Sequence, residues 1–145
     1  MRYAAVDQRG LKIFVYSKHK TVSGILLSVG GVRALDRADM EGIGLALRQA
    51  FSGYQTGVPD QRHSAVRGWP ELFAAAGVRS WTEYGKGAKS LSAKLQDGLV
   101  TLNPWKNIGG RFRFEPLKGF DRTVPEKSPD RDLGAAVIAA LGDAQ

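Results

Sequence analysis

The two histidines are the side chains best suited to proton transfer near neutral pH. His19 lies among lysines, and His63 lies in a stretch rich in glycine, proline and polar residues. A general base needs a positioned partner, and Asp60 or Ser64 could serve His63 in that role. Neither histidine belongs to a recognisable catalytic constellation, and surface histidines are far commoner than catalytic ones. The sequence therefore predicts a protein that is not an enzyme.

Metal and phosphate chemistry are weakly supported. Two histidines, no cysteine and no dense carboxylate cluster cannot assemble a typical zinc site, so we expect no metal and no cofactor. Residues 85–90 read Gly-Lys-Gly-Ala-Lys-Ser and superficially suggest a phosphate-binding loop. Ala88 stands where that motif has a glycine, and Glu83 occupies the position of its first glycine. A flexible basic turn is the simpler interpretation.

One segment raises nucleic-acid binding as an alternative. Residues 111–114 read Arg-Phe-Arg-Phe, with Trp105 and Lys106 shortly before them. Cations alternating with rings can form a stacking platform with phosphate contacts beside it. Strand alternation, however, sends Phe112 and Phe114 to one face and the arginines to the other, which favours rings in the core and arginines in solvent.

The net charge of +7 is concentrated in the middle of the chain. Between Arg62 and Lys118 there are ten Lys and Arg residues against four acidic ones. Such a field attracts an anionic partner and accelerates its encounter, whether that partner is nucleic acid, an acidic protein or a membrane surface.

Length and composition predict one soluble domain spanning residues 1–145. The hydrophobic content is 43%, and no apolar run approaches the roughly 20 residues that a membrane-spanning helix needs. Residues 1–30 lack the pattern of a secretory signal, and there is no cysteine. We expect a cytoplasmic protein.

The elements that must position these groups begin with two apolar runs, residues 11–16 and 21–29, which predict paired strands. Asp36 is expected to cap the next helix, with Asp39 in its first turn. Residues 53–68 predict a long exposed loop, and residues 69–77 predict a short helix that starts at a proline and stops at a glycine.

Residues 91–102 predict a hairpin, because Asp97-Gly98 supplies the positive backbone angles of a two-residue turn. The expected register places Gln96 opposite Leu99, Leu95 opposite Val100 and Ala93 opposite Leu102. Pro104 is expected to end the second strand. Residues 123–125 predict a short extended stretch, and the last helix is expected to start with Ser128 as its cap and Pro129 in its first turn.

Residues 43–51 and 133–141 share one pattern: aliphatic, Gly, any residue, Ala, aliphatic, two variable residues, Ala, large apolar. Small residues on one face of each helix would let another element approach closely. The order of elements predicts an α+β fold, an α/β sandwich in which a curved, mainly antiparallel sheet packs against these two related helices plus one short helix.

Four segments resemble immunity proteins of bacterial contact-dependent growth inhibition systems. They are the C-terminal residues 128–136, the hairpin strand 97–104, residues 77–81 and the early strand 14–18. The resemblance implies a small cytoplasmic protein that binds the toxic C-terminal domain of a large secreted effector, and we expect one immunity protein for each toxin domain. It implies non-catalytic blockage of a toxin, often a nuclease, at its active site or an adjacent surface, with no membrane partner.

The family has no fixed binding motif, since each immunity protein matches its own toxin. A nucleic-acid mimic aimed at a nuclease would be acidic, whereas this chain is basic, so either the toxin surface is acidic or shape and apolar anchors set the contact. We expect the toxin-facing surface to use basic residues of the middle region with Trp105 as an aromatic anchor, unless Trp105 is a core ring. The predicted residues are Arg62, Arg67, Lys86, Lys89, Trp105, Lys106 and Arg111.

Overall fold

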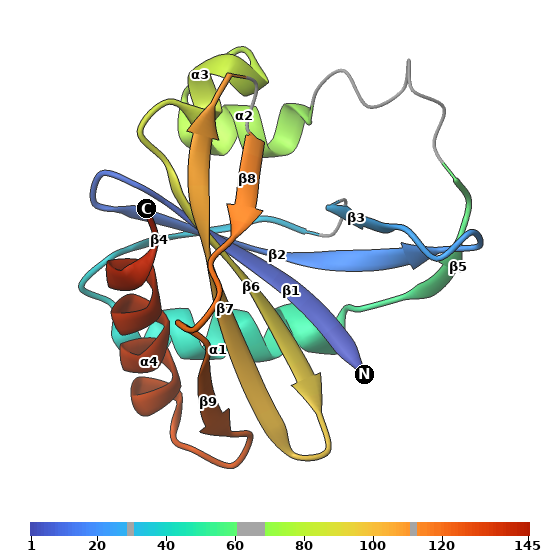
Figure 1. Ribbon diagram of the computed structural model, residues 1–145, viewed down its shortest axis with the longest axis vertical. Helices are drawn as coiled ribbons and strands as arrows, with labels where there is room; N and C mark the ends of the chain where they lie inside the picture. The colour runs from blue at the N-terminus through green and yellow to red at the C-terminus, as the bar shows by residue number, and fades with distance from the viewer. Residues whose placement is uncertain (29–30, 61–68, 111–112) are drawn as a thin grey trace.

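A curled sheet forms the body of the protein in the computed structural model, which describes residues 1–28, 31–60, 69–110 and 113–145 (Figure 1). The sheet order is β3-β2-β1-β6-β7-β8, with β4 and β5 pairing with β2, and β9 pairing with β7. Every pairing is antiparallel except that of β5 with β2. The strands are β1 (Arg2–Arg9), β2 (Lys12–Thr21), β3 (Leu26–Ser28), β4 (Arg33–Asp36), β5 (Thr56–Val58), β6 (Lys89–Gln96), β7 (Leu99–Gly109), β8 (Arg113–Pro116) and β9 (Arg122–Pro125).

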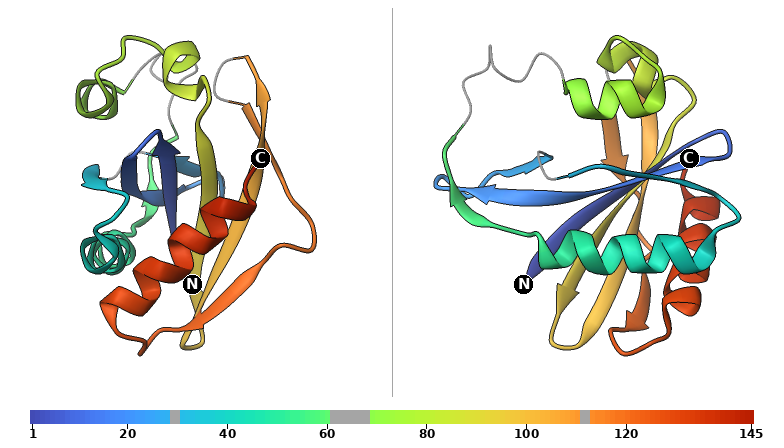
Figure 2. Two further views of the ribbon diagram at one scale, coloured as in Figure 1. Left: turned by 90° about the vertical axis from the view of Figure 1, so that its left-hand side faces the viewer. Right: turned by 180° about the vertical axis from the view of Figure 1, so that it is seen from behind.

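The helices are α1 (Met40–Ser52), α2 (Pro70–Ala76), α3 (Trp81–Gly85) and α4 (Asp130–Asp143). Figure 2 shows α1 and α4 crossing beside the sheet, while α2 and α3 lie together at one end of it. This arrangement confirms the predicted α+β architecture, with α3 as a second short helix. Among the described residues no helix is long and apolar enough to cross a membrane.

The two related helices pack against each other through their glycines. A methyl group on Gly44 would collide with the carbonyl oxygen of Asp130, the first residue of α4. A methyl group on Gly134 would collide with the carbonyl oxygen of Met40, the first residue of α1. The first residue of each helix therefore packs against the glycine of the other helix. This reciprocal contact explains why the pattern occurs twice.

The main core lies between these helices and one face of the sheet. Ile43 and Leu47 of α1 and Leu133 and Val137 of α4 are fully or almost fully buried, at the three-to-four-residue spacing of one helical stripe. The sheet contributes alternate residues of four central strands, as period-two geometry requires. These residues are Ala4, Val6, Ile13, Val15, Leu91, Ala93, Val100 and Leu102.

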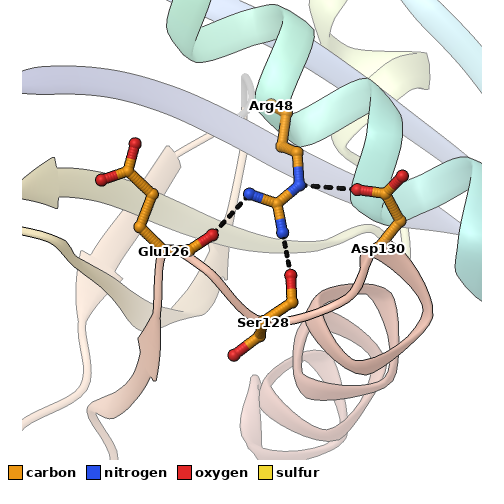
Figure 3. A network of polar contacts seen from close by, with 4 residues as sticks. All are labelled: Arg48, Glu126, Ser128 and Asp130. Carbon is orange, nitrogen blue, oxygen red and sulfur yellow. Dashed lines mark hydrogen bonds and ion pairs between the residues drawn. The ribbon is translucent and has the colours of Figure 1, made fainter.

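Arg48 of α1 ties the two helices together at the edge of this core (Figure 3). Its Nε lies 2.6 Å from the Asp130 carboxylate, and one terminal nitrogen donates to the Glu126 carbonyl at 2.6 Å. The other terminal nitrogen donates to the carbonyl of Ser128. One guanidinium thus holds both the chain leading into α4 and the first residue of α4.

Several local predictions are confirmed. The β6–β7 hairpin has the expected register, and both Asp97 and Gly98 have positive φ angles of 53° and 76°. The short helix α2 begins at Pro70 and ends at Gly77 in the left-handed conformation. The predicted extended stretch 123–125 lies within β9.

The predicted pairing of the first strands is wrong in part. Residues 12–16 pair mainly with β1, which the sequence did not predict, across a turn at Gly10. Alanine is a poor strand former, so Ala4 and Ala5 gave no strand signal, although both are buried in β1. Within the predicted second strand, Leu26–Ser28 does pair with β2, but opposite residues 18–20 rather than 11–16.

Two helix starts also differ from prediction. Asp39, not Asp36, is the N-cap of α1, and its side chain accepts from the Gly42 amide. Asp36 instead belongs to β4 and accepts from the amide of Ala38. Pro129, not Ser128, is the cap residue of α4 and makes no side-chain hydrogen bond there. The carbonyl of Ser128 accepts a hydrogen bond from Arg48 of α1, so a side chain of another helix stabilises the start of α4.

Pro104 does not end β7, which continues to Gly109. The Pro104 carbonyl accepts from Leu117 N, between the segments of β7 that pair with β9 and with β8. The N–H and C=O of a strand residue point to the same side of the strand. Proline has no N–H, and at Pro104 that lack falls between the β9 and β8 pairings, where no ladder hydrogen bond is lost. In the predicted long loop, Thr56–Val58 forms β5, and residues 61–68 lie outside the described residues.

Candidate functional site

The face of the sheet opposite α1 and α4 divides into two ends. At one end α2 and α3 cover it, with Leu72, Phe73 and Tyr84 packed on Phe14. At the other end lies a depression of about 210 Å³, which is lined in part by half-exposed side chains from four different strands. We call these four residues, Lys18, Ser92, Trp105 and Phe114, the Trp105 face.

Trp105 is held in a fixed orientation on this face. Its indole Nε1 donates to Ser92 Oγ at 3.0 Å, across the β6–β7 pair. The Lys18 ammonium lies 5.9 Å from the centre of the ring. Trp105 is half-exposed and is not part of either buried core cluster. An aromatic ring fixed by one polar contact and still open to solvent has the character of an interface anchor.

Lys18 has an unusual environment for a lysine. Burial lowers its pKa, and the negative charge of the nearby Asp7 side chain partly counteracts that shift. The two ion pairs found among the described residues involve other groups, Arg48 with Asp130 and Arg122 with Asp143. Lys18 is therefore a partly desolvated cation with no ion-pair partner in the described part of the chain.

Asp7, at the covered end of the same face, is a carboxyl group that solvent cannot reach. Tyr84 and Tyr16 donate to its Oδ2 at 2.6 and 2.7 Å, and Ser90 donates to its Oδ1 at 2.7 Å. Burial raises the pKa of Asp7, while the three hydroxyl groups act to lower it. Because the residue is 0% exposed, no substrate can touch it, and the cluster joins β1, β2, α3 and β6 instead.

His19, the first candidate for proton transfer, has a structural role. It is 8% exposed, and its Nδ1 accepts from the Gln55 amide at 2.9 Å. Burial lowers its pKa, which favours the neutral ring that this acceptor role requires. His63 and Ser64 lie outside the described residues. In the ranges that the structure describes, no three His, Asp or Glu side chains gather in a way that could hold a metal ion.

The structure separates the residues predicted to face a toxin. Lys86 and Lys89 line one depression together with Asn107, whose amide nitrogen donates to the Gly85 and Ala88 carbonyls. Asn107 thus connects the predicted basic turn to β7. Lys106 follows Trp105 on β7 and so points to the opposite face of the strand. Arg62, Arg67 and Arg111 lie outside the described residues.

The Arg-Phe segment is only partly described. Residues 113–116 form β8, where Phe114 is half-buried and Arg113 is exposed. Phe114 lines the depression beside Trp105, so it does not take the core position that strand alternation favoured. Arg111 and Phe112 are not among the described residues.

Sequence reasoning missed Lys18 and Ser92 as members of a site. Lys18 falls between the predicted strands 11–16 and 21–29, whereas β2 runs on to Thr21 and its alternation carries Phe14, Tyr16 and Lys18 on one face. The signal was present in residues 12–21, where that alternation continues past the predicted end of the strand. Ser92 could have been paired with Asn103 from the predicted hairpin register, and this is the observed pairing.

Comparisons with known proteins find one matching family and several similar folds. Residues 59–143 match the family model of the CDI immunity protein. Among solved structures, a protein of unknown function from Neisseria meningitidis aligns with a TM-score of 0.82 and 15% identity, covering 99% of this chain and 95% of that one. The CdiA-CT/CdiI toxin and immunity complex from Yersinia pseudotuberculosis aligns with a TM-score of 0.78 and 15% identity, covering 99% of this chain and 97% of that chain.

No curated protein matches the sequence. The two structural likenesses, at 15% identity, show a shared fold. The family model matches more than half of the chain, from the end of β5 to the last turn of α4. It includes the β6–β7 hairpin and the second copy of the repeated helix, where the resemblance was read from the sequence. The chain belongs to the CDI immunity protein family.

Proposed function

We propose that this protein binds the toxic C-terminal domain of a contact-dependent growth inhibition effector and neutralises it in the cytoplasm of the producing cell. The observation that carries the proposal is the Trp105 face: an oriented, half-buried ring on the sheet with a cation beside it. Family membership and the likeness to a chain of a toxin and immunity complex supply the class of partner.

The proposed mechanism is occlusion without chemistry. The buried carboxyl of Asp7 is saturated by three hydroxyl groups, and His19 is neutral and engaged as an acceptor. Neither group is placed to attack a substrate. A firm sheet surface can instead cover the toxin's active site or an adjacent surface, with one immunity protein for each toxin domain.

The charge of the protein bears on which part of the toxin it covers. We propose a nuclease toxin contacted through an acidic surface, because a chain with net charge +7 cannot imitate nucleic acid. The pair Lys86 and Lys89 would then steer the encounter from the rim, while Trp105 supplies the buried anchor. Rim charges affect mainly the rate of association, whereas buried anchors affect mainly dissociation.

Affinity of the purified protein for the C-terminal toxin domain of its cognate effector tests the proposal. Trp105→Ala should weaken the complex by about tenfold or more, as expected for a central aromatic anchor. Ile108→Ala is the matched control, because Ile108 is 41% exposed on the opposite face of the same strand. Equal effects of the two substitutions would remove the Trp105 face as the binding surface. Cell survival on co-expression without complex formation would refute direct neutralisation.

The proposed roles of the lysines can be separated from that of the ring. Lys86→Glu combined with Lys89→Glu should slow association and reduce its dependence on salt, with dissociation little changed. Lys106→Glu tests the remaining predicted cation on the far face of β7. Unchanged association kinetics in both variants would remove the predicted basic surface from the interface.

Nucleic-acid binding is the alternative, and one observation favours it: Phe114, Trp105 and Lys18 share one face. Two rings with a cation beside them are the components of a single-strand stacking platform. Binding of this kind would weaken steeply as salt increases, through counterion release. Titration of single-stranded RNA at two salt concentrations tests it, and no binding at low salt would end this alternative.

A further inference from the structure

Lys18 and Ser92 present two unused donors to one depression. The Lys18 ammonium has no hydrogen bond or ion pair in the described part of the chain, and it lies over the Trp105 ring. Ser92 Oγ accepts from the Trp105 indole, which leaves its own hydroxyl proton available. The neighbouring Ser90 differs, because its proton is already given to Asp7.

The surroundings of these donors favour an anion over water. Trp105 and Phe114 line the depression together with the buried Ala5 and Tyr16 side chains. Apolar walls lower the local dielectric constant and strengthen a charge-assisted hydrogen bond. The same burial penalises the lysine while it stays unpaired, and it lowers the pKa of Lys18. An anionic group that enters the depression removes that penalty.

We infer that this depression receives the carboxylate of an Asp or Glu side chain of the toxin, with Lys18 and Ser92 as its two donors and Trp105 stacked against its stem. The inference rests on the proposed function and names the chemistry of the partner residue. A carboxylate suits two donors that line one depression, because each of its oxygens can accept one hydrogen bond. The carboxylate contact would also add one buried, directional interaction to the long-range attraction between the basic protein and an acidic toxin surface.

The toxin complex gives the direct test. Lys18→Met keeps the length of the side chain and removes the charge, and it should weaken toxin binding by about tenfold or more, mainly through faster dissociation. Lys127→Met is the control, because Lys127 is exposed in the connection between β9 and α4. If the wild-type protein binds the toxin and Lys18→Met binds it equally well, the carboxylate site is refuted and the proposed function stands. Failure of the wild-type protein to bind any toxin domain overturns the proposed function.

A second test needs no toxin. The indole N–H signal of Trp105 can be followed by NMR during titration with glutarate, with neutral glutaramide and with inorganic phosphate at constant ionic strength. Glutarate should shift this signal together with the Ser92 amide, glutaramide should not, and Lys18→Met should abolish the shift. A response equal to that of glutaramide, no response, or a response to phosphate alone overturns the assignment.

Discussion

The two faces of the sheet are stabilised by different kinds of contact. On the face that carries α1 and α4, close packing decides the structure: apolar side chains fill the core, and each glycine admits the backbone of the other helix. On the opposite face, one end combines the apolar cluster of α2, α3 and Phe14 with the hydroxyl groups around Asp7, and the other end carries the half-buried side chains around Trp105. The comparison teaches that one end of a sheet face can be firmly packed while its other end stays free to match a partner.

The largest expected effect is at the end of the opposite face that α2 and α3 cover. Asp7→Ala removes the acceptor of three hydroxyl groups, two of them on the buried Tyr16 and Tyr84. We expect the free energy of unfolding to fall by about 4 kcal/mol, because buried hydroxyl groups without a partner are costly. Urea unfolding measures the loss. Asp7→Asn, which keeps one oxygen acceptor, should lose less, and equal losses would show that the hydroxyl cluster is not what stabilises this end.

The glycine contacts on the helical face come next. Gly134→Ala and Gly44→Ala should each cost about 3 kcal/mol, because the new methyl group meets the backbone of the other helix, which cannot rotate away. Gly142→Ala is the matched control in α4, since no atom lies within 4 Å of its added methyl group. It should stabilise the helix by up to about 1 kcal/mol. Similar effects at Gly134 and Gly142 would contradict the close approach of the helices.

Arg48 tests whether polar contacts add to the helical face. Arg48→Met should cost about 1 to 2 kcal/mol, because one half-buried guanidinium serves the Asp130 carboxylate and two carbonyl groups. Arg122→Met is the comparison, since Arg122 is more exposed than Arg48 and contacts the carboxylate of Asp143 alone. Its loss should stay below about 0.5 kcal/mol. Thermal unfolding of both variants would separate them, and equal shifts would reduce Arg48 to an ordinary surface ion pair.

The smallest effect is expected at Lys18 and has the opposite sign. Because burial lowers the pKa of Lys18, the folded state disfavours its charge, and Lys18→Met should raise stability slightly at neutral pH. In the unfolded chain Lys18 has its usual pKa of 10.5, so as the pH rises toward that value the folded protein loses the Lys18 proton first. The free energy of unfolding of the wild-type protein should therefore increase relative to that of the variant over this pH range. Chemical unfolding at pH 7 and at higher pH measures this, and a destabilised variant would contradict the account.

Much of the fold follows from local patterns in the sequence. The turn at Asp97-Gly98 fixed the hairpin register, and the repeated glycine pattern correctly predicted a close approach. Strand β1 was missed, because Ala4 and Ala5 carry little local preference for a strand. The start of α4 was displaced because Arg48, distant in sequence, holds the Ser128 carbonyl. Long-range contacts of this kind leave no local signal.

The site was harder to predict than the fold. Trp105 was identified as a possible anchor, but the cations grouped with it by sequence lie on other surfaces where the structure describes them. Lys106 was grouped with Trp105 because the two are adjacent in sequence, but neighbouring residues of a strand point to opposite faces. Lys18, which does lie over the ring, comes from a distant strand. A surface built across a sheet needs the pairing of strands before its members can be named.

The Arg48 contact also bears on the order of folding. Arg48 and Asp130 are separated by 82 positions in the chain, and the two glycine contacts span a similar distance. Closing so long a loop is slow, so α1 should keep an unsatisfied apolar stripe until α4 docks. An intermediate with that stripe open would be prone to association with other chains. Before the two helices pack together, the exposed apolar stripe of α1 is thus the surface that a molecular chaperone would bind.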